Sequence, residues 1–73
     1  MNDLICDLVN AVFENSTKDV RFKVSFDTSH GRNTFNVWAF TDDKAYLILD
    51  DVALDINKDN VRKAMIEIKG FKL

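Results

Sequence analysis

The chain has 73 residues, of which 47% are hydrophobic and 30% charged, and its ten basic and twelve acidic side chains give a formal net charge of −2. This composition excludes an intrinsically disordered chain and predicts one compact domain over residues 1–73, small enough that each large apolar side chain matters to the core. Because the charge is nearly balanced, the basic excess typical of duplex-binding domains is missing, and direct nucleic-acid binding is less favoured.

The single cysteine, Cys6, cannot form an internal disulfide, whereas small secreted domains usually contain several. The first residues lack a basic segment, and no apolar run is long enough to span a bilayer. We therefore expect a cytoplasmic protein without membrane association. No Cys and His spacing matches a metal site and no phosphate-binding loop is visible, so no cofactor is expected.

The first predicted element is an amphipathic helix over Asp3–Glu14. Its apolar residues recur at helical spacing: Leu4, Ile5, Leu8, Val9, Val12 and Phe13. Asn2 or Asp3 is expected to cap this helix, and Asn15 begins the polar stretch that ends it. The apolar face indicates core packing, and Cys6 beside it is expected to be a partly buried structural thiol.

Three strands are predicted next, over Val20–Phe26, Thr34–Phe40 and Ala45–Asp51, with turns at Asp27–Asn33 and Thr41–Lys44. The first strand alternates apolar and polar residues, which is typical of an antiparallel strand with one solvated face. The second is partly apolar on both faces, which indicates a central strand. Gly31 is the natural position for a positive φ in the first turn.

This pattern leaves the register open, because a shift of one residue exchanges the two faces of a strand. We favour an arrangement in which six apolar residues pack beneath the helices: Phe22, Val24, Phe35, Val37, Leu47 and Leu49. The open face then carries Arg21, Lys23, Asn36, Trp38 and, in one variant, Tyr46. In the other register Trp38 belongs to the core, and it is also covered if the tail Phe71–Leu73 folds over it.

Residues Val52–Ile56 fit a continuation of the third strand, one helical turn or a connection. A second helix follows, with Asn57 or Asp59 as its cap. Its apolar residues recur at i, i+3, i+4 and i+7: Val61, Ala64, Met65 and Ile68. Gly70 fits the C′ position, with Phe71 available for a hydrophobic contact. The predicted fold is α+β, a helix, a three-stranded antiparallel meander and a helix (αβββα), with both helices on one sheet face.

Candidate catalytic residues are few. His30 is the only histidine, and the nearest acid in sequence, Asp27, is more simply a turn residue. We expect His30 to be an exposed loop residue, and a chain this small has little room for a ligand pocket. The sequence therefore predicts a protein that is not an enzyme.

Surface features point to binding instead. Half of the twelve acids lie between residues 42 and 59. The candidate partner-binding residues are Asp42, Asp43, Asp50, Asp51 and Asp55, with Trp38 as an anchor. Such acids also end strands, cap helices and confer solubility, and the spacing lacks the Gly and terminal Glu of an EF-hand calcium loop. The alternative is a nucleic-acid-binding module in which Trp38, between Arg21 and Lys23, forms a stacking platform.

The order of helix, three strands and helix is that of double-stranded-RNA-binding domains. That family has a Gly-Pro-x-His turn and a Lys-rich opening of the last helix. Here the turn is Ser29-His30-Gly31-Arg32 and the helix opens Asp59-Asn60-Val61-Arg62-Lys63. RNA binding is therefore not carried over.

Four features follow one another along the chain: the opening Met1-Asn2-Asp3-Leu4-Ile5, the Lys18-Asp19 pair before the first strand, the meander and the acid-rich second half. In this order the chain resembles the small acidic phage-encoded anti-CRISPR proteins that block the guide-RNA nuclease of type II systems. The resemblance covers most of the chain. It implies a non-catalytic inhibitor, in the host cell cytoplasm, whose acids occupy the basic DNA-reading groove of a larger protein. A homodimer through the open sheet face or a strand edge is compatible with both binding hypotheses.

Overall fold

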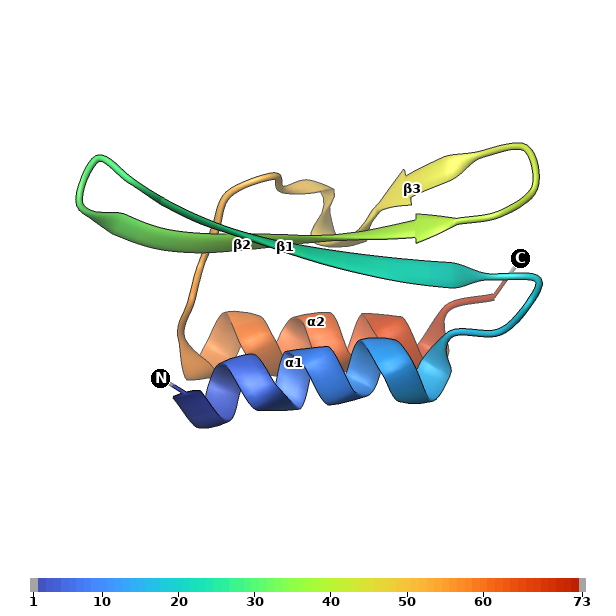
Figure 1. Ribbon diagram of the computed structural model, residues 1–73, viewed down its shortest axis with the longest axis horizontal. Helices are drawn as coiled ribbons and strands as arrows, with labels where there is room; N and C mark the ends of the chain where they lie inside the picture. The colour runs from blue at the N-terminus through green and yellow to red at the C-terminus, as the bar shows by residue number, and fades with distance from the viewer. Residues whose placement is uncertain (1, 73) are drawn as a thin grey trace.

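The computed structural model describes residues 2–72 and shows an α+β fold of two layers, with two helices on one face of a four-stranded antiparallel sheet (Figure 1). The elements in chain order are α1 (Asn2–Asn15), β1 (Arg21–Ser29), β2 (Arg32–Phe40), β3 (Ala45–Leu47), the 3-10 turn η1 (Ile48–Asp50), β4 (Leu54–Asp55) and α2 (Lys58–Gly70). The strand order is β1-β2-β3, and β4 also pairs with β2. The predicted order and the placement of both helices on one face are confirmed, and β4 is an addition.

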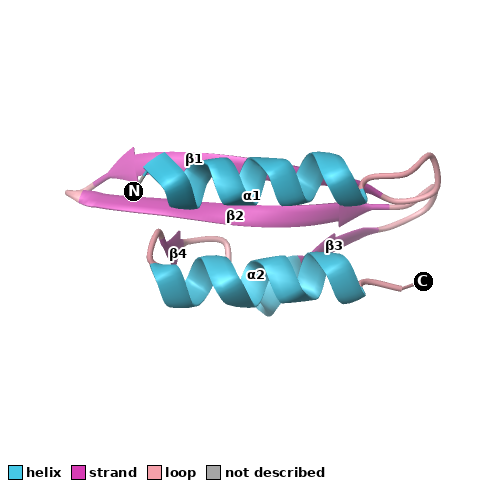
Figure 2. Ribbon diagram, turned by 90° about the horizontal axis from the view of Figure 1, so that it is seen from below, coloured by secondary structure: helices cyan, strands magenta, loops and turns pink. Residues whose placement is uncertain are grey.

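The two helices divide the sheet between them. In the view from the helix side, α1 lies over β1 and β2, and α2 lies on the side of β3 and β4 (Figure 2). Neither helix, within residues 2–72, is long and apolar enough to cross a bilayer.

The hairpin of β1 and β2 is longer than the sequence predicts. Asp27–Ser29 continue β1, and Arg32 and Asn33 begin β2, so the turn consists of His30 and Gly31 alone. Both turn residues have a positive φ, 54° and 73°. This is the combination of a type I′ turn, whose twist matches that of the flanking strands.

The third strand is shorter than the predicted Ala45–Asp51, because β3 ends at Leu47. Leu49 and Asp50 have left-handed backbone, with φ of 60° and 51°, so the strand cannot continue through them. The chain turns, places Ile48 in the core and returns to β2 at β4. The ambiguous residues 52–56 are thus a connection that contains a two-residue strand.

The register of β1 and β2 pairs Phe22 with Ala39 and Val24 with Val37 on the face that the helices cover. The buried apolar side chains are Leu8, Ala11, Val12, Phe35, Val37, Ala39, Ile48, Leu54, Val61, Ala64 and Ile68. Two predicted positions are wrong. Leu47 pairs with Trp38, so it lies on the open face, and Tyr46 pairs with Ala39 on the helix side.

The second helix begins with an Asn57 cap, whose side chain accepts a hydrogen bond from the N–H of Asn60 at 2.8 Å. Its end differs from the prediction, because Gly70 is still helical and Phe71 is the C-cap. The Phe71 ring lies 5.7 Å from Phe22 and 5.6 Å from Tyr46 between ring centroids. Phe71 therefore closes one end of the core instead of covering Trp38, while Leu73 lies outside the described residues.

Candidate binding surface

The sheet face opposite the helices carries two aromatic rings that no helix of residues 2–72 covers. Trp38 and Phe40 alternate along β2, and their rings are stacked with centroids 6.5 Å apart and an interplanar angle of 29°. Phe40 is 40% exposed, and Trp38 is half-buried. Leu47, directly opposite Trp38 on β3, extends this apolar area.

Two cations of β1 lie directly opposite these rings. The register pairs Lys23 with Trp38 and Arg21 with Phe40. Directly opposite side chains have Cβ atoms about 5 Å apart, which is within reach of a cation–π contact. Within the described part of the chain, neither Arg21 nor Lys23 forms an ion pair, so both charges are available to a partner.

The segment between η1 and β4 borders this face. The Asn36 side chain, on the same face of β2 as Trp38, donates from Nδ2 to the carbonyl oxygen of Val52 at 3.1 Å. Val52 is itself exposed. The open face therefore consists of a central aromatic pair, a basic margin on β1 and an apolar margin towards β3 and Val52.

The candidate acids do not gather into one patch. Asp42 and Asp43 lie in the turn after β2, whereas Asp55 of β4 pairs with Thr34 near the start of that strand. The six-residue separation of Thr34 and Phe40 corresponds to about 20 Å along the strand. Asp50 and Asp51 lie at the end of η1 and just after it.

Several of these acids already have local partners. The Asp43 carboxylate accepts from the Thr41 hydroxyl at 3.3 Å, and the Asp51 carboxylate accepts from the N–H of Ala53 at 2.9 Å. The Asp55 carboxylate forms an ion pair with Arg32 at 2.7 Å. Asp42 and Asp50 make no such bond within residues 2–72, so they are the acids most available to a partner.

The two residues considered for catalysis lie apart from any polar cluster. His30 is exposed at the tip of the β1–β2 hairpin. Cys6 is exposed, which corrects the expectation of a partly buried thiol; its position on α1 is turned away from the sheet. Neither side chain makes a hydrogen bond or ion pair with the described residues. No group of three His, Cys, Asp or Glu residues that could hold a metal ion is present among residues 2–72.

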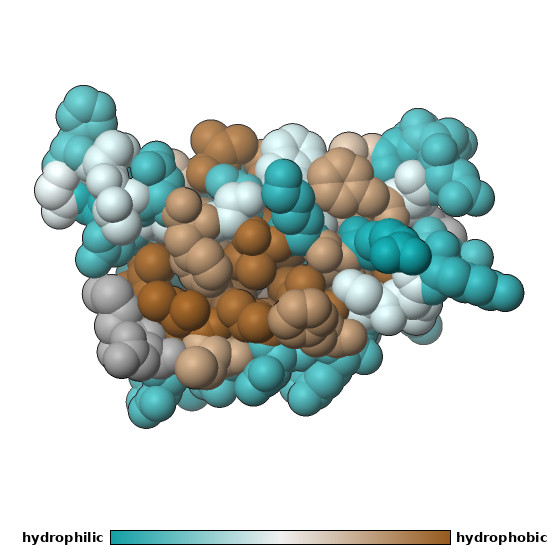
Figure 3. Space-filling view, in the orientation of Figure 1, coloured by the Kyte–Doolittle hydropathy of each residue, from teal (hydrophilic) through white to brown (hydrophobic). Residues whose placement is uncertain are grey.

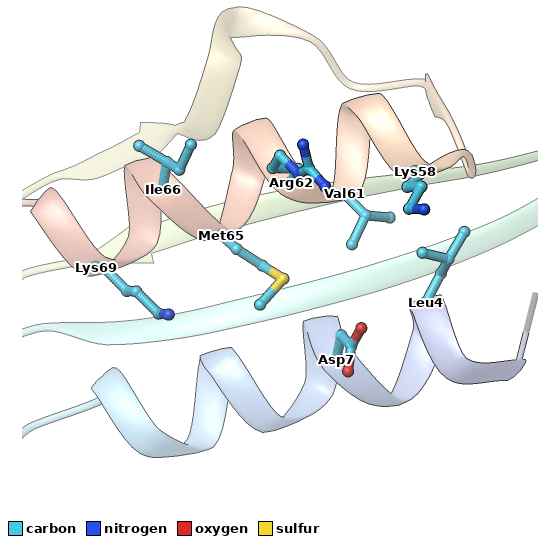
Figure 4. Close-up of a pocket in the computed structure, with 8 residues that line it drawn as sticks. All are labelled: Leu4, Asp7, Lys58, Val61, Arg62, Met65, Ile66 and Lys69. Carbon is cyan, nitrogen blue, oxygen red and sulfur yellow. The ribbon is translucent and has the colours of Figure 1, made fainter.

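A groove of about 300 Å³ runs between α1 and α2, in the helix layer (Figure 4). Its lining residues are Leu4, Asp7, Lys58, Val61, Arg62, Met65, Ile66 and Lys69. Asp7 forms no ion pair with the three cations. The groove is bordered by three basic side chains, and its lining residues include no nucleophile and no histidine.

Leu47 is the residue of the open face that sequence reasoning places wrongly. The turn after β2 is closed by a hydrogen bond from the N–H of Thr41 to the carbonyl oxygen of Lys44 at 2.9 Å. This closure sets Phe40 opposite Ala45 and therefore Trp38 opposite Leu47. The polar Thr41–Lys44 turn was visible in the sequence, but only the hydrogen bond that closes it determines how β3 pairs with β2.

Comparison of the chain with protein-family models, with curated proteins and with solved structures finds no match.

Proposed function

We propose that this chain is a non-enzymatic protein-binding domain whose partner docks on the open sheet face, with Trp38 and Phe40 as anchors. The observation that carries the proposal is the stacked pair of rings, left uncovered because both helices pack on the opposite face. Trp, Phe and Arg are enriched in protein interfaces, and Trp and Arg also among the residues that dominate binding energy. Arg21 lies directly opposite Phe40.

The proposed partner is a larger protein with a basic groove, such as a nucleic-acid-handling enzyme, which the bound chain inhibits. Asp42 and Asp50 support this part of the proposal, because they are exposed and have no partner within residues 2–72. Complementary charge at the rim of an interface raises the association rate and selects the partner. The cytoplasm is the proposed compartment, and the lone cysteine supports it.

The non-enzymatic part of the proposal is supported by the positions of the reactive side chains. General acid–base catalysis needs a positioned partner within hydrogen-bond reach. His30 at the hairpin tip and Cys6 on α1 have none among the described residues. Their substitution is expected to leave partner binding unchanged.

The test is affinity capture from lysate of the source organism with quantitative mass spectrometry. A specific partner should be captured by the wild-type chain and lost with Trp38→Ser and Phe40→Ser. The matched control is Ile66→Ser, which removes a 63% exposed apolar side chain from α2 and should retain the partner. Asp42→Lys and Asp50→Lys should weaken capture without disturbing a local hydrogen bond. A partner that is retained by both aromatic variants would contradict the proposal.

A second function is favoured by the cations opposite the rings. Lys23 beside Trp38 and Arg21 beside Phe40 form the arrangement that single-strand nucleic-acid-binding proteins use, in which bases stack on aromatic rings and phosphates meet cations. The chain would then bind single-stranded nucleic acid on the same face.

The only tryptophan of the chain, Trp38, reports on this alternative directly. Titration with single-stranded oligonucleotides should quench its fluorescence, and the affinity should fall as salt rises. Lys23→Ala should reduce that salt dependence. Unchanged fluorescence at low salt excludes this alternative, and the protein-binding test above is then decisive.

A further inference from the structure

The long strand β1 is an edge of the sheet whose outer side is unpaired. Its only strand neighbour within the described chain is β2, although it runs over nine residues from Arg21 to Ser29. Unpaired edge strands of this length invite pairing with another strand, and proteins commonly cover them or interrupt them. No proline or bulge interrupts β1, because its register with β2 is continuous from Arg21 to Ser29.

The backbone groups that face outward follow from the hairpin. In a two-residue hairpin the closing pair, here Ser29 and Arg32, is hydrogen-bonded, and hydrogen-bonded pairs alternate along the ladder. The backbone N–H and C=O groups of the even-numbered residues of β1 therefore point outward, away from β2. The N–H of Phe22 confirms this, because it donates to the Ser16 hydroxyl at 3.1 Å instead of to β2. Within residues 2–72, the outward amides without a hydrogen-bond partner are those of Val24, Phe26 and Thr28.

We propose that two copies of this chain dimerise through their β1 strands, paired antiparallel about a twofold axis at Ser25. Val24 then lies opposite Phe26 of the second copy, and Phe22 lies opposite Thr28. In this register each free outward amide meets an outward carbonyl of the other strand. The dimer has one continuous sheet, with the two Trp38 faces on the same side.

Charge complementarity supports this register. Lys23 lies opposite Asp27 of the second copy, twice by symmetry, and opposite charges facing each other across a ladder stabilise it. Neither residue forms an ion pair within residues 2–72. A shift of the axis from Ser25 to Lys23 would place Lys23 against its own copy, and like charges directly opposite are unfavourable.

The exposed apolar residues on this side support the same partner. Figure 3 shows hydrophobic side chains gathered in the band between the sheet and α1, on the side viewed in Figure 1. Leu4 and Asp7 of α1 border the groove towards α2 (Figure 4). Ile5, Val9 and Phe13 repeat every fourth residue and so lie on the other flank of the helix. Phe13 is 76% exposed, and Phe26 of β1 is 41% exposed.

The axis at Ser25 also brings the two α1 helices into register. Ser16 is level with Phe22 through their hydrogen bond. Ser25 lies three residues beyond Phe22, which is about 10 Å along the strand and corresponds to roughly seven residues of a helix. Counting back seven residues from Ser16 places the axis level with Val9. Ile5 and Phe13 flank Val9 symmetrically, so each Phe13 meets Ile5 of the second copy.

The spacing of the helices fits as well. Figure 2 shows α1 beneath β1 and β2. Since strands lie about 4.8 Å apart, an axis just outside β1 places the two copies of α1 about 10 Å apart. This is the usual distance between packed helices.

The first experiment tests the register. In a Cys6→Ser background, Ser25→Cys places two thiols on the axis in a non-hydrogen-bonded pair, with Cα atoms about 4.5 Å apart, which suits a disulfide. Mild oxidation should link Ser25→Cys chains into covalent dimers. Ser29→Cys, near the end of the same strand, is the matched control and should stay unlinked. Equal linkage of both variants, or none of Ser25→Cys, would overturn the register.

The second experiment tests the charges on the 8.4 kDa chain by sedimentation equilibrium and native mass spectrometry. Wild type should dimerise, and Lys23→Asp or Asp27→Lys alone should weaken dimerisation about tenfold or more. An equimolar mixture of the two variants should restore a heterodimer, because each copy then faces an opposite charge. Arg62→Asp on α2 and Asp50→Lys at the end of η1 are charge-matched controls away from β1 and should dimerise as wild type does.

Two results would overturn the dimer itself. One is a wild-type chain that stays monomeric at every concentration up to its solubility limit. The other is a dimer that Trp38→Ser dissociates while Lys23→Asp leaves it intact, since that places the contact on the open face. The first result is independent of whether the open face binds a further protein, whereas the second would make the proposed docking face the dimer contact.

Discussion

The hydroxyl oxygen of Ser16 lies 3.1 Å from the backbone nitrogen of Phe22 and accepts its hydrogen bond. The same hydroxyl donates to the carbonyl oxygen of Val12 at 2.7 Å. One side chain thus connects the end of α1 to the beginning of the edge strand. It also determines which residues of α1 lie level with which residues of β1.

Ser16→Ala is expected to lower the free energy of unfolding by about 1–2 kcal/mol, because the N–H of Phe22 loses its partner in a half-buried place. Urea denaturation measures the change. Ser29→Ala is the control, since its hydroxyl donates only to the exposed Asp27 at 3.2 Å, and it should change stability by less than about 0.5 kcal/mol. Equal effects of the two substitutions would contradict this account.

The elements with strong periodicity were predictable. The alternation of Phe22, Val24 and Phe26 with polar residues defines the two faces of β1, and the i, i+3, i+4, i+7 spacing of α2 defines its buried side. The favoured register places Trp38 on the sheet face opposite the helices, and the pairing of β1 with β2 confirms this position. The pattern alone left both registers open, because a shift of one residue exchanges the two faces of β2, and it did not select Phe40 as a site residue.

The end of the third strand was not predictable in the same way. Left-handed backbone is favoured at Gly, Asn and Asp, so Asp50 fits this preference but Leu49 does not. Tertiary packing supplies the reason, because the turn brings Ile48 into the core beside α2. The distribution of the acids depends on this turn, so their division into separate places could not be predicted either.

Asp50→Gly is expected to preserve or raise stability, by up to about 1 kcal/mol, because glycine adopts a φ of 51° without steric cost. Asp50→Val should lower it by about 1–2 kcal/mol, since a branched side chain is disfavoured there. Thermal denaturation measures both. Asp51→Gly is the neighbouring control and should destabilise, because Asp51 is extended, with φ −138°, and accepts from Ala53. The prediction would be contradicted if Asp50→Gly and Asp51→Gly changed the stability in the same direction.

Phe71→Ala should lower the free energy of unfolding by about 2 kcal/mol, because the ring fills the end of the core between Phe22 and Tyr46. Phe71→Leu retains most of the apolar area and should cost about half as much. Chemical denaturation compares them with Ile66→Ala, which removes an exposed side chain from the same end of α2 and should be nearly neutral. A neutral Phe71→Ala would show that the tail does not close the core.

The ion pair of Arg32 and Asp55 connects the hairpin to β4. Both Nε and Nη2 of Arg32 donate to one carboxylate oxygen, at 3.0 and 2.7 Å, but the side chains are 57% and 56% exposed. A double-mutant cycle with Arg32→Ala and Asp55→Ala should therefore give a coupling energy below about 1 kcal/mol that falls with added salt. The i,i+4 pair of Lys63 and Asp59, at 3.8 Å, is the control and should couple more weakly.

The same cycle separates stability from binding at this acid. Because Arg32 neutralises Asp55, Asp55→Ala should reduce partner capture less than Asp42→Ala, whose carboxylate has no partner within residues 2–72. Arg32→Ala exposes the Asp55 charge and should leave capture unchanged or increase it. If Asp55→Ala instead abolished capture while Asp42→Ala did not, the paired acid would be a direct contact with the partner.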